Sequence, residues 1–105
     1  MSTTRYEVAQ EVRGQEGAQC AHLGQVQDVT PSTLEGCEDC LKAGGTWVHL
    51  RECLACGHIG CCDNSPNRHA TGHWKGAQHP VVRSFEPGEA WAWCYDDQLF
   101  LLPAE

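Results

Sequence analysis

Residues 53–79 of this chain read CLACGHIGCCDNSPNRHATGHWKGAQH, and eight of them are cysteine or histidine. Similar spacing continues outside this stretch, with Cys-x-His at residue 20, Cys-x2-Cys at residue 37 and a last cysteine at residue 94. Thiolates and imidazoles are the usual ligands of zinc, and a structural zinc site takes four of them. The spaced set is one donor short of three complete sites, and its members are Cys20, His22, Cys37, Cys40, Cys53, Cys56, Cys61, His69, His73, His79 and Cys94.

The composition explains why the chain needs metal in order to fold. Only 18 of the 105 residues are Leu, Ile, Val or Phe, and the net charge is −7, a combination that is typical of disordered chains. Zinc binding contributes about 10–16 kcal/mol per site in small peptides, and it becomes folding free energy where the unfolded chain has no site. We therefore expect a single zinc-nucleated domain.

Disulfides are the main alternative explanation for eight cysteines. They would require an oxidising compartment, yet residues 1–10 lack the apolar segment of a secretion signal, and no apolar run is long enough to cross a membrane. The interleaved histidines also favour metal, because a disulfide makes no use of imidazole. The sequence therefore predicts a cytoplasmic, zinc-binding protein with no membrane association.

The spacing CxxC-x12-H-x3-H that starts at Cys53 matches the ligand pattern of a DNA-reading zinc finger. Such a finger also requires a large aromatic residue four positions after its second cysteine and a leucine three before its first histidine. This chain has Gly60 and Pro66 at those positions. A phosphate backbone would also repel the negative charge of the chain, and its Lys and Arg residues are scattered and form no basic stripe. The sequence therefore predicts no nucleic-acid partner.

The residues between the ligands predict a small α+β fold, a twisted antiparallel sheet with one main helix. Ser65 is a good helix N-cap and Pro66 fits the first helical position, so the helix is expected to run to about Lys75 and stop at Gly76. Residues 1–19 have the composition of a flexible N-terminal tail, and the domain is expected to cover residues 20–105. Apolar or alternating segments predict strands at residues 46–51, 81–85, 91–95 and 99–102, the last two forming a hairpin around Asp96 and Asp97.

The order of the ligands, together with Trp-Cys-Tyr near the end of the chain, resembles that of the zinc-finger ubiquitin-binding (UBP-type) domain. That family occurs in ubiquitin-specific proteases and in a cytoplasmic histone deacetylase. The resemblance covers about residues 20–102, and the Cys-Gly-His-Ile-Gly-Cys stretch is most similar to the short stand-alone bacterial members. The resemblance implies a small zinc-stabilised domain with cross-braced zinc knuckles.

The pairing of ligands in that family, carried onto the matching positions, implies two complete zinc sites. Each site takes one histidine from the predicted helix, so the helix is locked to both knuckles. The implied first site is Cys37, Cys40, Cys61 and His69, and the implied second site is Cys53, Cys56, His73 and His79.

The implied third site joins Cys20 and His22 to Cys94, and it lacks the cysteine that three-zinc family members carry three residues later. That position is Asp97 here, and a carboxylate is an acceptable zinc ligand. We therefore expect three zinc ions, or two if this site is empty. Asp96 is a weaker substitute, and the alternative is an unmetallated corner in which Asp97 is a turn residue.

The resemblance also implies recognition of a free C-terminal Gly-Gly tail, such as that of unanchored ubiquitin. Trp47 matches the aromatic wall of the family's tail pocket, and Tyr95 matches the tyrosine that contacts the terminal glycine. The family's arginine two residues after the third cysteine is Asp63 here, which would repel a tail carboxylate unless Arg51 or Arg68 swings in. The alternative for both aromatic residues is packing against the sheet.

We expect a monomeric, non-catalytic module whose partner is a protein or a peptide C-terminus. The alternatives are a purely structural zinc module that docks on a protein partner, and a hydrolase. Because filled zinc sites leave no open coordination position, a hydrolase would need the third site to stay open, with an aspartate as base. The residues expected outside the metal sites are His49, His58 and Cys62.

Overall fold

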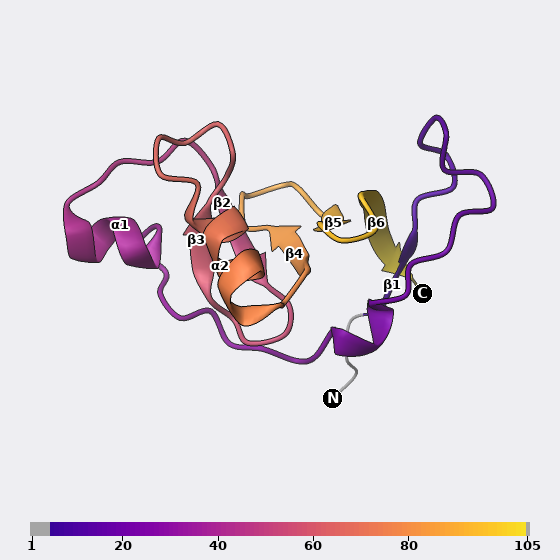
Figure 1. Ribbon diagram of the computed structural model, residues 1–105, viewed down its shortest axis with the longest axis horizontal. Helices are drawn as coiled ribbons and strands as arrows, with labels where there is room; N and C mark the ends of the chain where they lie inside the picture. The colour runs from indigo at the N-terminus through magenta and orange to yellow at the C-terminus, as the bar shows by residue number, and fades with distance from the viewer. Residues whose placement is uncertain (1–4, 105) are drawn as a thin grey trace.

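The computed structural model describes residues 5–104, which form a six-stranded antiparallel sheet, two helices and a 3-10 turn (Figure 1). The strand order is β1-β6-β5-β4-β2-β3, so the beginning and the end of the chain form one edge of the sheet. This architecture confirms the predicted α+β fold with one main helix, α2. The elements are β1 Arg5–Val8, η1 Leu23–Gln25, α1 Glu38–Ala43, β2 Leu50–Cys53, β3 Ile59–Cys61, α2 His69–Ala77, β4 Val81–Ser84, β5 Ala92–Cys94 and β6 Leu99–Ala104.

The two faces of the sheet are covered by different segments. Successive side chains of a strand point to opposite sides, so the register separates two cross-strand rows. We call one side the arm face, because the segment of residues 20–30 covers it, and the other the helix face, because α2 packs there against β3. The rows are Glu52, Arg83, Ala92 and Leu101 on the arm face and Val82, Trp93 and Phe100 on the helix face.

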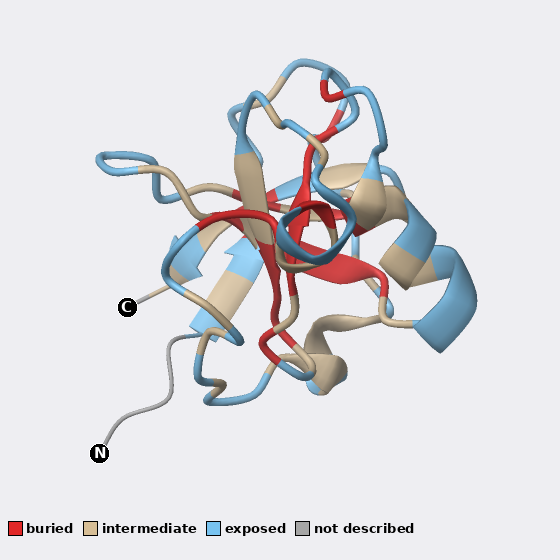
Figure 2. Ribbon diagram, turned by 90° about the vertical axis from the view of Figure 1, so that its left-hand side faces the viewer, coloured by how far each residue is buried: buried red, intermediate tan, exposed pale blue. Residues whose placement is uncertain are grey.

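The apolar core lies on the arm face, between the sheet and the N-terminal segment. Leu23, Val26 and Val29 of that segment pack onto it. Figure 2 shows the buried residues gathered along the strands in the middle of the molecule, with exposed loops around them. The buried members of this core are Val8, Leu54, Val81, Ala92, Cys94 and Leu101.

The other end of the sheet has almost no aliphatic core. Its buried cluster consists of Cys37, Cys40 and Cys61, each 0% exposed, with Trp47 and Leu50 packed beside it. Sulfur atoms therefore fill the position that aliphatic side chains occupy in an ordinary domain.

The N-terminal segment differs from the flexible tail predicted for residues 1–19. Arg5–Val8 form β1, which pairs with the end of β6. The buried Gln15 amide donates to the carbonyls of Ala9 and Phe100 and accepts from Phe100 N–H. These hydrogen bonds connect positions far apart in the sequence, so local composition gives no sign of them; residues 1–4 of the predicted tail lie outside the described residues.

The strand predicted at residues 46–51 lies further along the chain, as β2 at Leu50–Cys53. The Val48 N–H donates to the Ser65 hydroxyl at 2.8 Å instead of joining a strand ladder. β2 pairs on one side with β3 and on the other with β4. The short strand β3, Ile59–Cys61, was not predicted, because its three residues include a glycine.

The main helix begins three residues later than predicted. Ser65 does not cap it, because its hydroxyl accepts from Val48, and the helix starts at His69 after Arg68, whose φ is 49°. The His69 N–H donates to the Cys61 sulfur at 3.2 Å, so a thiol takes the role of the capping oxygen. The helix also continues past Gly76 to Ala77, and the residue after it, Gln78, adopts the left-handed region at φ 59°.

The predicted C-terminal strands are present. β4 covers Val81–Ser84, and β5 and β6 form the hairpin around Asp96 and Asp97. The hairpin brings Asp97 back beside Cys94, whose sulfur accepts from the Asp97 N–H at 3.5 Å. Across residues 5–104, no helix combines the length and apolarity needed to cross a membrane.

Candidate metal centres

The first cluster of ligands lies where α1, β3 and α2 meet. The distance between the sulfurs of Cys40 and Cys61 is 3.9 Å, and the Nδ1 atom of His69 is 3.2–3.6 Å from the three sulfurs. Zn–S bonds of about 2.3 Å in a tetrahedron place sulfur atoms about 3.8 Å apart, so these spacings fit one tetrahedral zinc. Cluster 1 consists of Cys37, Cys40, Cys61 and His69.

Local backbone structure positions the first two sulfurs. Cys37 is the N-cap of α1, and its sulfur accepts from the Cys40 N–H at 3.4 Å. The helix ends at Gly44, whose left-handed φ of 76° glycine adopts without strain. The Gly45 that follows passes so close to Cys40 and Asn67 that a Cβ there would lie 2.7 Å from the Asn67 amide nitrogen. This knuckle is thus a tight turn that holds the thiols of Cys37 and Cys40 toward the centre of cluster 1.

The second cluster lies at the end of β2 and the C-terminal half of α2. The Cys56 sulfur is 3.3 Å from Nε2 of His73. Among the described residues, the buried Nδ1 atom of His79 has no hydrogen-bond partner, as expected for a nitrogen that coordinates a metal. The Cys53 carbonyl accepts from the Gly57 N–H at 2.8 Å, which closes the turn. Cluster 2 consists of Cys53, Cys56, His73 and His79.

The helix α2 belongs to both clusters. His69, in its first turn, points to cluster 1, and His73, one turn later, points to cluster 2. Metal in both clusters would therefore fix this helix at two points against β2 and β3. These are the two ligand sets that the family resemblance implies.

The third cluster joins the start of the chain to the β5–β6 hairpin. The Asp97 Oδ2 atom lies 2.9 Å from His22 Nδ1 and 3.7 Å from the Cys94 sulfur. The hydrogen bond from His22 is the main reason that the pKa of Asp97 is lowered to about 2, so this carboxylate is ionised throughout the neutral range. Cluster 3 consists of Cys20, His22, Cys94 and Asp97.

Comparison with known proteins agrees with this geometry. The family described as "Zn-finger in ubiquitin-hydrolases and other protein" matches residues 37–104. The chain belongs to this family. The solution NMR structure of a Rhodopseudomonas palustris protein is 51% identical to the chain, superposes with a TM-score of 0.73, and covers 79% of this chain and 80% of its own. No curated protein matches the chain.

Around cluster 3 of this UBP-type zinc finger, Asp96 has a different place from Asp97. Its Oδ2 atom lies 3.3 Å from Nε2 of His22, on the ring nitrogen that faces away from the cluster. Its Oδ1 atom accepts from the Trp74 indole N–H at 2.8 Å. A carboxylate on the far nitrogen of a ligating histidine fixes the ring orientation and the tautomer. Asp96 is thus placed to orient His22.

Burial raises the pKa of four cluster thiols, those of Cys20, Cys37, Cys53 and Cys94, when no metal is bound. It raises the pKa of Cys20 and Cys37 to about 12 and that of Cys53 to about 11. Zinc binds the thiolate, so binding must displace these protons. All eight cysteines of the zinc finger are free thiols, and seven of them lie in clusters 1–3.

The remaining histidines and the spare cysteine lie outside clusters 1–3. His58 contacts the Asp39 carboxylate at 2.9 Å and stacks on His73 with ring centroids 4.2 Å apart, so it supports a member of cluster 2. Cys62 is buried, 3.6 Å from the Ser65 hydroxyl. His49 is exposed beside it, and its carbonyl accepts from the Cys62 N–H.

The helix face carries a small cavity of about 210 Å³ that the tail-pocket residues only partly match. Tyr95 lines it, but Trp47 packs against cluster 1 and Arg68 precedes α2, and neither is among the lining residues. Position 51 supplies the cation instead: the Arg51 guanidinium lies 4.6 Å from the centre of the Trp91 ring. The lining residues are Arg51, Cys62, Asp63, Asn64, Val82, Trp91, Trp93, Tyr95 and Phe100.

Trp47 was expected in the tail pocket because the family resemblance implied it, and Arg51 was named only as a cation that could swing toward a tail carboxylate. With the observed register, Arg51 pairs with Ser84 on the strand next to β5. Side chains alternate between the two faces along a strand, so Leu50 and Glu52 lie on one face and Arg51 on the other. This alternation is the sequence signal for the place of Arg51 on the helix face.

Proposed function

We propose that this domain is a non-catalytic peptide-binding module that three zinc ions hold in shape. Clusters 1 and 2 supply four protein ligands each, and Asp97 supplies the fourth ligand of cluster 3. A zinc with four protein ligands has no position for a substrate or a reactive water. The place of Asp97 in cluster 3 therefore favours a structural site there over the open site that a hydrolase would require.

The ligand of the module is a peptide with a free C-terminus, bound in the helix-face cavity. A cavity of about 210 Å³ is smaller than a drug-sized pocket of about 300–1,000 Å³ and suits the last two or three small residues of a chain. Tyr95 and Trp93 supply aromatic walls, and Tyr95 stacks on Trp74 of α2 with ring centroids 4.8 Å apart. The wall is therefore anchored to the helix that the zinc ions would fix.

Arg51 carries the proposal, because its guanidinium lines the same cavity as Tyr95. A carboxylate binds most strongly to charge-assisted donors, and arginine offers several in one plane. The cavity also holds Asp63, whose carboxylate accepts from the Thr71 hydroxyl of α2. Arg51 therefore has to offset Asp63 in order to bind a peptide carboxylate, and affinity for a tail is expected to depend on this pair.

A titration of the zinc-loaded protein with a peptide ending in Gly-Gly, beside its C-terminal amide, tests the proposal. We expect the acid to bind more tightly, Arg51→Ala to lose the difference between acid and amide, and Asp63→Asn to strengthen binding of the acid. Arg68→Ala is the matched control, because Arg68 is a cation outside the cavity. Equal affinity for acid and amide, or binding of neither, would contradict the proposal.

The chemistry of the zinc sites also bears on where the protein works. Seven of the proposed ligands are thiolates, and free thiols persist in compartments that keep cysteines reduced. We therefore propose a cytoplasmic location. A zinc finger that acts only as a structural docking unit would show the same metal content but no preference for a free carboxylate.

A further inference from the structure

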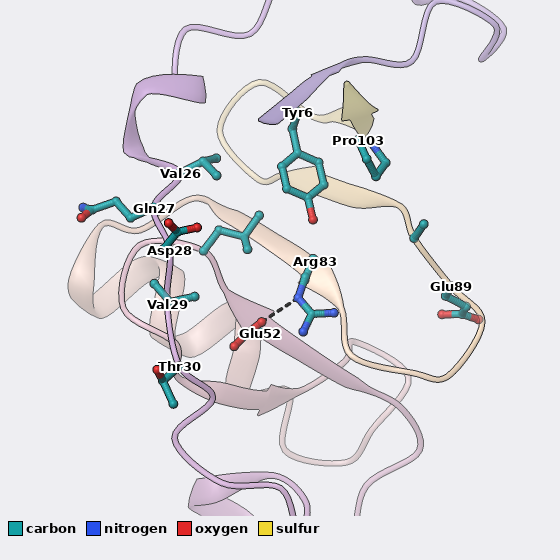
Figure 3. Close-up of a pocket in the computed structure, with 12 residues that line it drawn as sticks. Tyr6, Val26, Gln27, Asp28, Val29, Thr30, Glu52, Arg83, Glu89 and Pro103 are labelled. Carbon is teal, nitrogen blue, oxygen red and sulfur yellow. Dashed lines mark hydrogen bonds and ion pairs between the residues drawn. The ribbon is translucent and has the colours of Figure 1, made fainter. Parts of the chain in front are cut away.

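The arm face holds a second cavity, on the side of the sheet opposite the helix-face cavity. It has a volume of about 670 Å³ and lies between the extended segment of residues 26–30 and strands β2 and β4 (Figure 3). Tyr6 reaches into it from β1, with its hydroxyl toward Arg83 (Figure 3). None of the metal clusters and none of the residues proposed to bind a peptide C-terminus line it.

A buried carboxylate lies on the floor of this cavity. Glu52 is 2% exposed, and its Oε1 atom accepts from Nε of Arg83 at 2.6 Å. Its Oε2 atom is buried and has no hydrogen-bond partner among the described residues. Burial raises the pKa of Glu52 although Arg83 lowers it. One arginine therefore does not fully compensate this carboxylate, and an unmet buried acceptor is costly.

Arg83, the cation beside Glu52, already uses two of its three nitrogens in other hydrogen bonds. Its Nε atom is engaged with Glu52, its Nη1 atom donates to the Ser84 carbonyl at 3.1 Å, and its guanidinium lies 5.0 Å from the centre of the Phe85 ring. Among the described residues no donor is placed to bind Oε2, so this acceptor remains for a donor on a bound molecule.

The charge of the cavity selects a cation. Its lining includes the carboxylates of Asp28, Glu52 and Glu89 against the single guanidinium of Arg83, and an excess of carboxylates attracts positive charge and raises its local concentration. The cavity is too large for a bare ion, and much of its wall is apolar. The apolar lining residues are Val26, Val29, Leu54, Ala90 and Pro103.

We propose that the arm-face cavity binds a primary ammonium group carried on an alkyl chain, with Glu52 as its partner. The ammonium donates to Glu52 Oε2, and the alkyl stem lies along Val29 and Leu54, as lysine stems do on apolar surfaces. The chemistry is shared by a lysine side chain of a protein and by a free aliphatic diamine.

Titration of the 15N-labelled, zinc-loaded protein separates these two sources. The probes are cadaverine, the blocked peptide acetyl-Gly-Lys-Gly-amide, and the same peptide with norleucine for lysine, which keeps the stem and lacks the charge. We expect one or both amines to shift the amide signals of residues 6, 54 and 83, and the norleucine peptide to bind at least about tenfold more weakly. Binding of cadaverine alone assigns a free amine, and binding of the lysine peptide assigns a protein side chain.

Glu52→Gln keeps the shape of the side chain, removes its charge and is expected to weaken amine binding about tenfold or more. Glu89→Gln, at an exposed position of the rim, is expected to weaken it by a smaller factor, and it tests the proposal even if Glu52→Gln alters the fold. Glu35→Gln, at an exposed carboxylate outside both cavities, is the matched control and should leave amine binding unchanged. The proposal is overturned if neither amine binds, if norleucine binds as well as lysine, or if both glutamine variants bind as the wild type does.

Discussion

The two ends of this sheet are ordered by different physical means. At the apolar end, defined here as β1, β4, β5 and β6, aliphatic side chains pack under the N-terminal arm. At the metal end, defined as α1, β2, β3 and α2, the buried cluster is made of cysteines. The first end has an apolar core in addition to cluster 3 at its hairpin, whereas the second has no comparable core without metal. A chain with few aliphatic residues can thus concentrate them at one end and use zinc at the other.

Removal of zinc is expected to have the largest effect and to separate the two ends. Chelation should collapse the amide signals of residues 37–79 while signals of β5 and β6 keep more of their dispersion, because structural zinc contributes about 10–16 kcal/mol per site in small peptides. Two-dimensional NMR before and after chelation measures this. Native mass spectrometry must first show that the protein is metal-free. If residues 37–79 then keep their native chemical shifts, metal does not order the metal end and the contrast between the two ends is wrong.

Leu101→Ala probes the apolar end. Leu101 is 0% exposed at the centre of the arm-face core, and truncation of such a leucine costs about 2–5 kcal/mol of unfolding free energy. Denaturant unfolding of the zinc-loaded protein measures the loss, and the zinc content should stay unchanged. Leu34→Ala, at a leucine that is 80% exposed, is the control and should change the free energy by less than about 0.5 kcal/mol.

Gly60→Ala tests how closely α2 packs on the sheet. A Cβ at Gly60 would lie 2.7 Å from the Ala70 nitrogen and 2.8 Å from its Cα, and backbone cannot move aside as a flexible side chain can. We expect a loss of about 1–3 kcal/mol and weaker zinc binding, because His69 and His73 would shift with the helix. Gly76→Ala has nothing within 4 Å and should instead stabilise the helix by up to about 1 kcal/mol. Equal stability of the two variants would contradict this packing.

Asp96→Asn is expected to have the smallest effect and to act on cluster 3 alone. Loss of the carboxylate that orients His22 should lower zinc affinity at this site about 10–100-fold and leave clusters 1 and 2 intact. Competition with a chromophoric chelator measures the three affinities. The account is contradicted if the affinities of clusters 1 and 2 fall together with that of cluster 3.

Much of the fold could be predicted because its signals are local. β4 and the terminal hairpin follow from short apolar runs separated by turn residues, and the family resemblance implied how the ligands group in space. The errors arose where distant contacts override local preference. Ser65 has the composition of a helix cap, but its hydroxyl serves Val48, 17 positions away. β1 depends on pairing with β6 at the far end of the chain.

The candidate sites divide in the same way. Metal clusters depend on residue type and order, which the sequence displays directly. The two cavities depend on which elements lie beside each face of β2, so the sequence offered Arg51 only as a cation that could swing in and gave no sign of the role of Glu52. Neither residue belongs to a motif. That Glu52 Oε2 lacks a hydrogen-bond partner can be recognised only when the positions of all its neighbours are known.

The number of zinc ions per chain tests the central claim most directly. It shows whether metal binds both at clusters 1 and 2, which share α2, and at cluster 3, which contains Asp97. Native mass spectrometry should find three zinc ions on the wild type, two on Asp97→Ala and three on Asp63→Asn, a matched loss of a carboxylate outside the clusters. Two zinc ions on the wild type, or three on Asp97→Ala, would contradict the account.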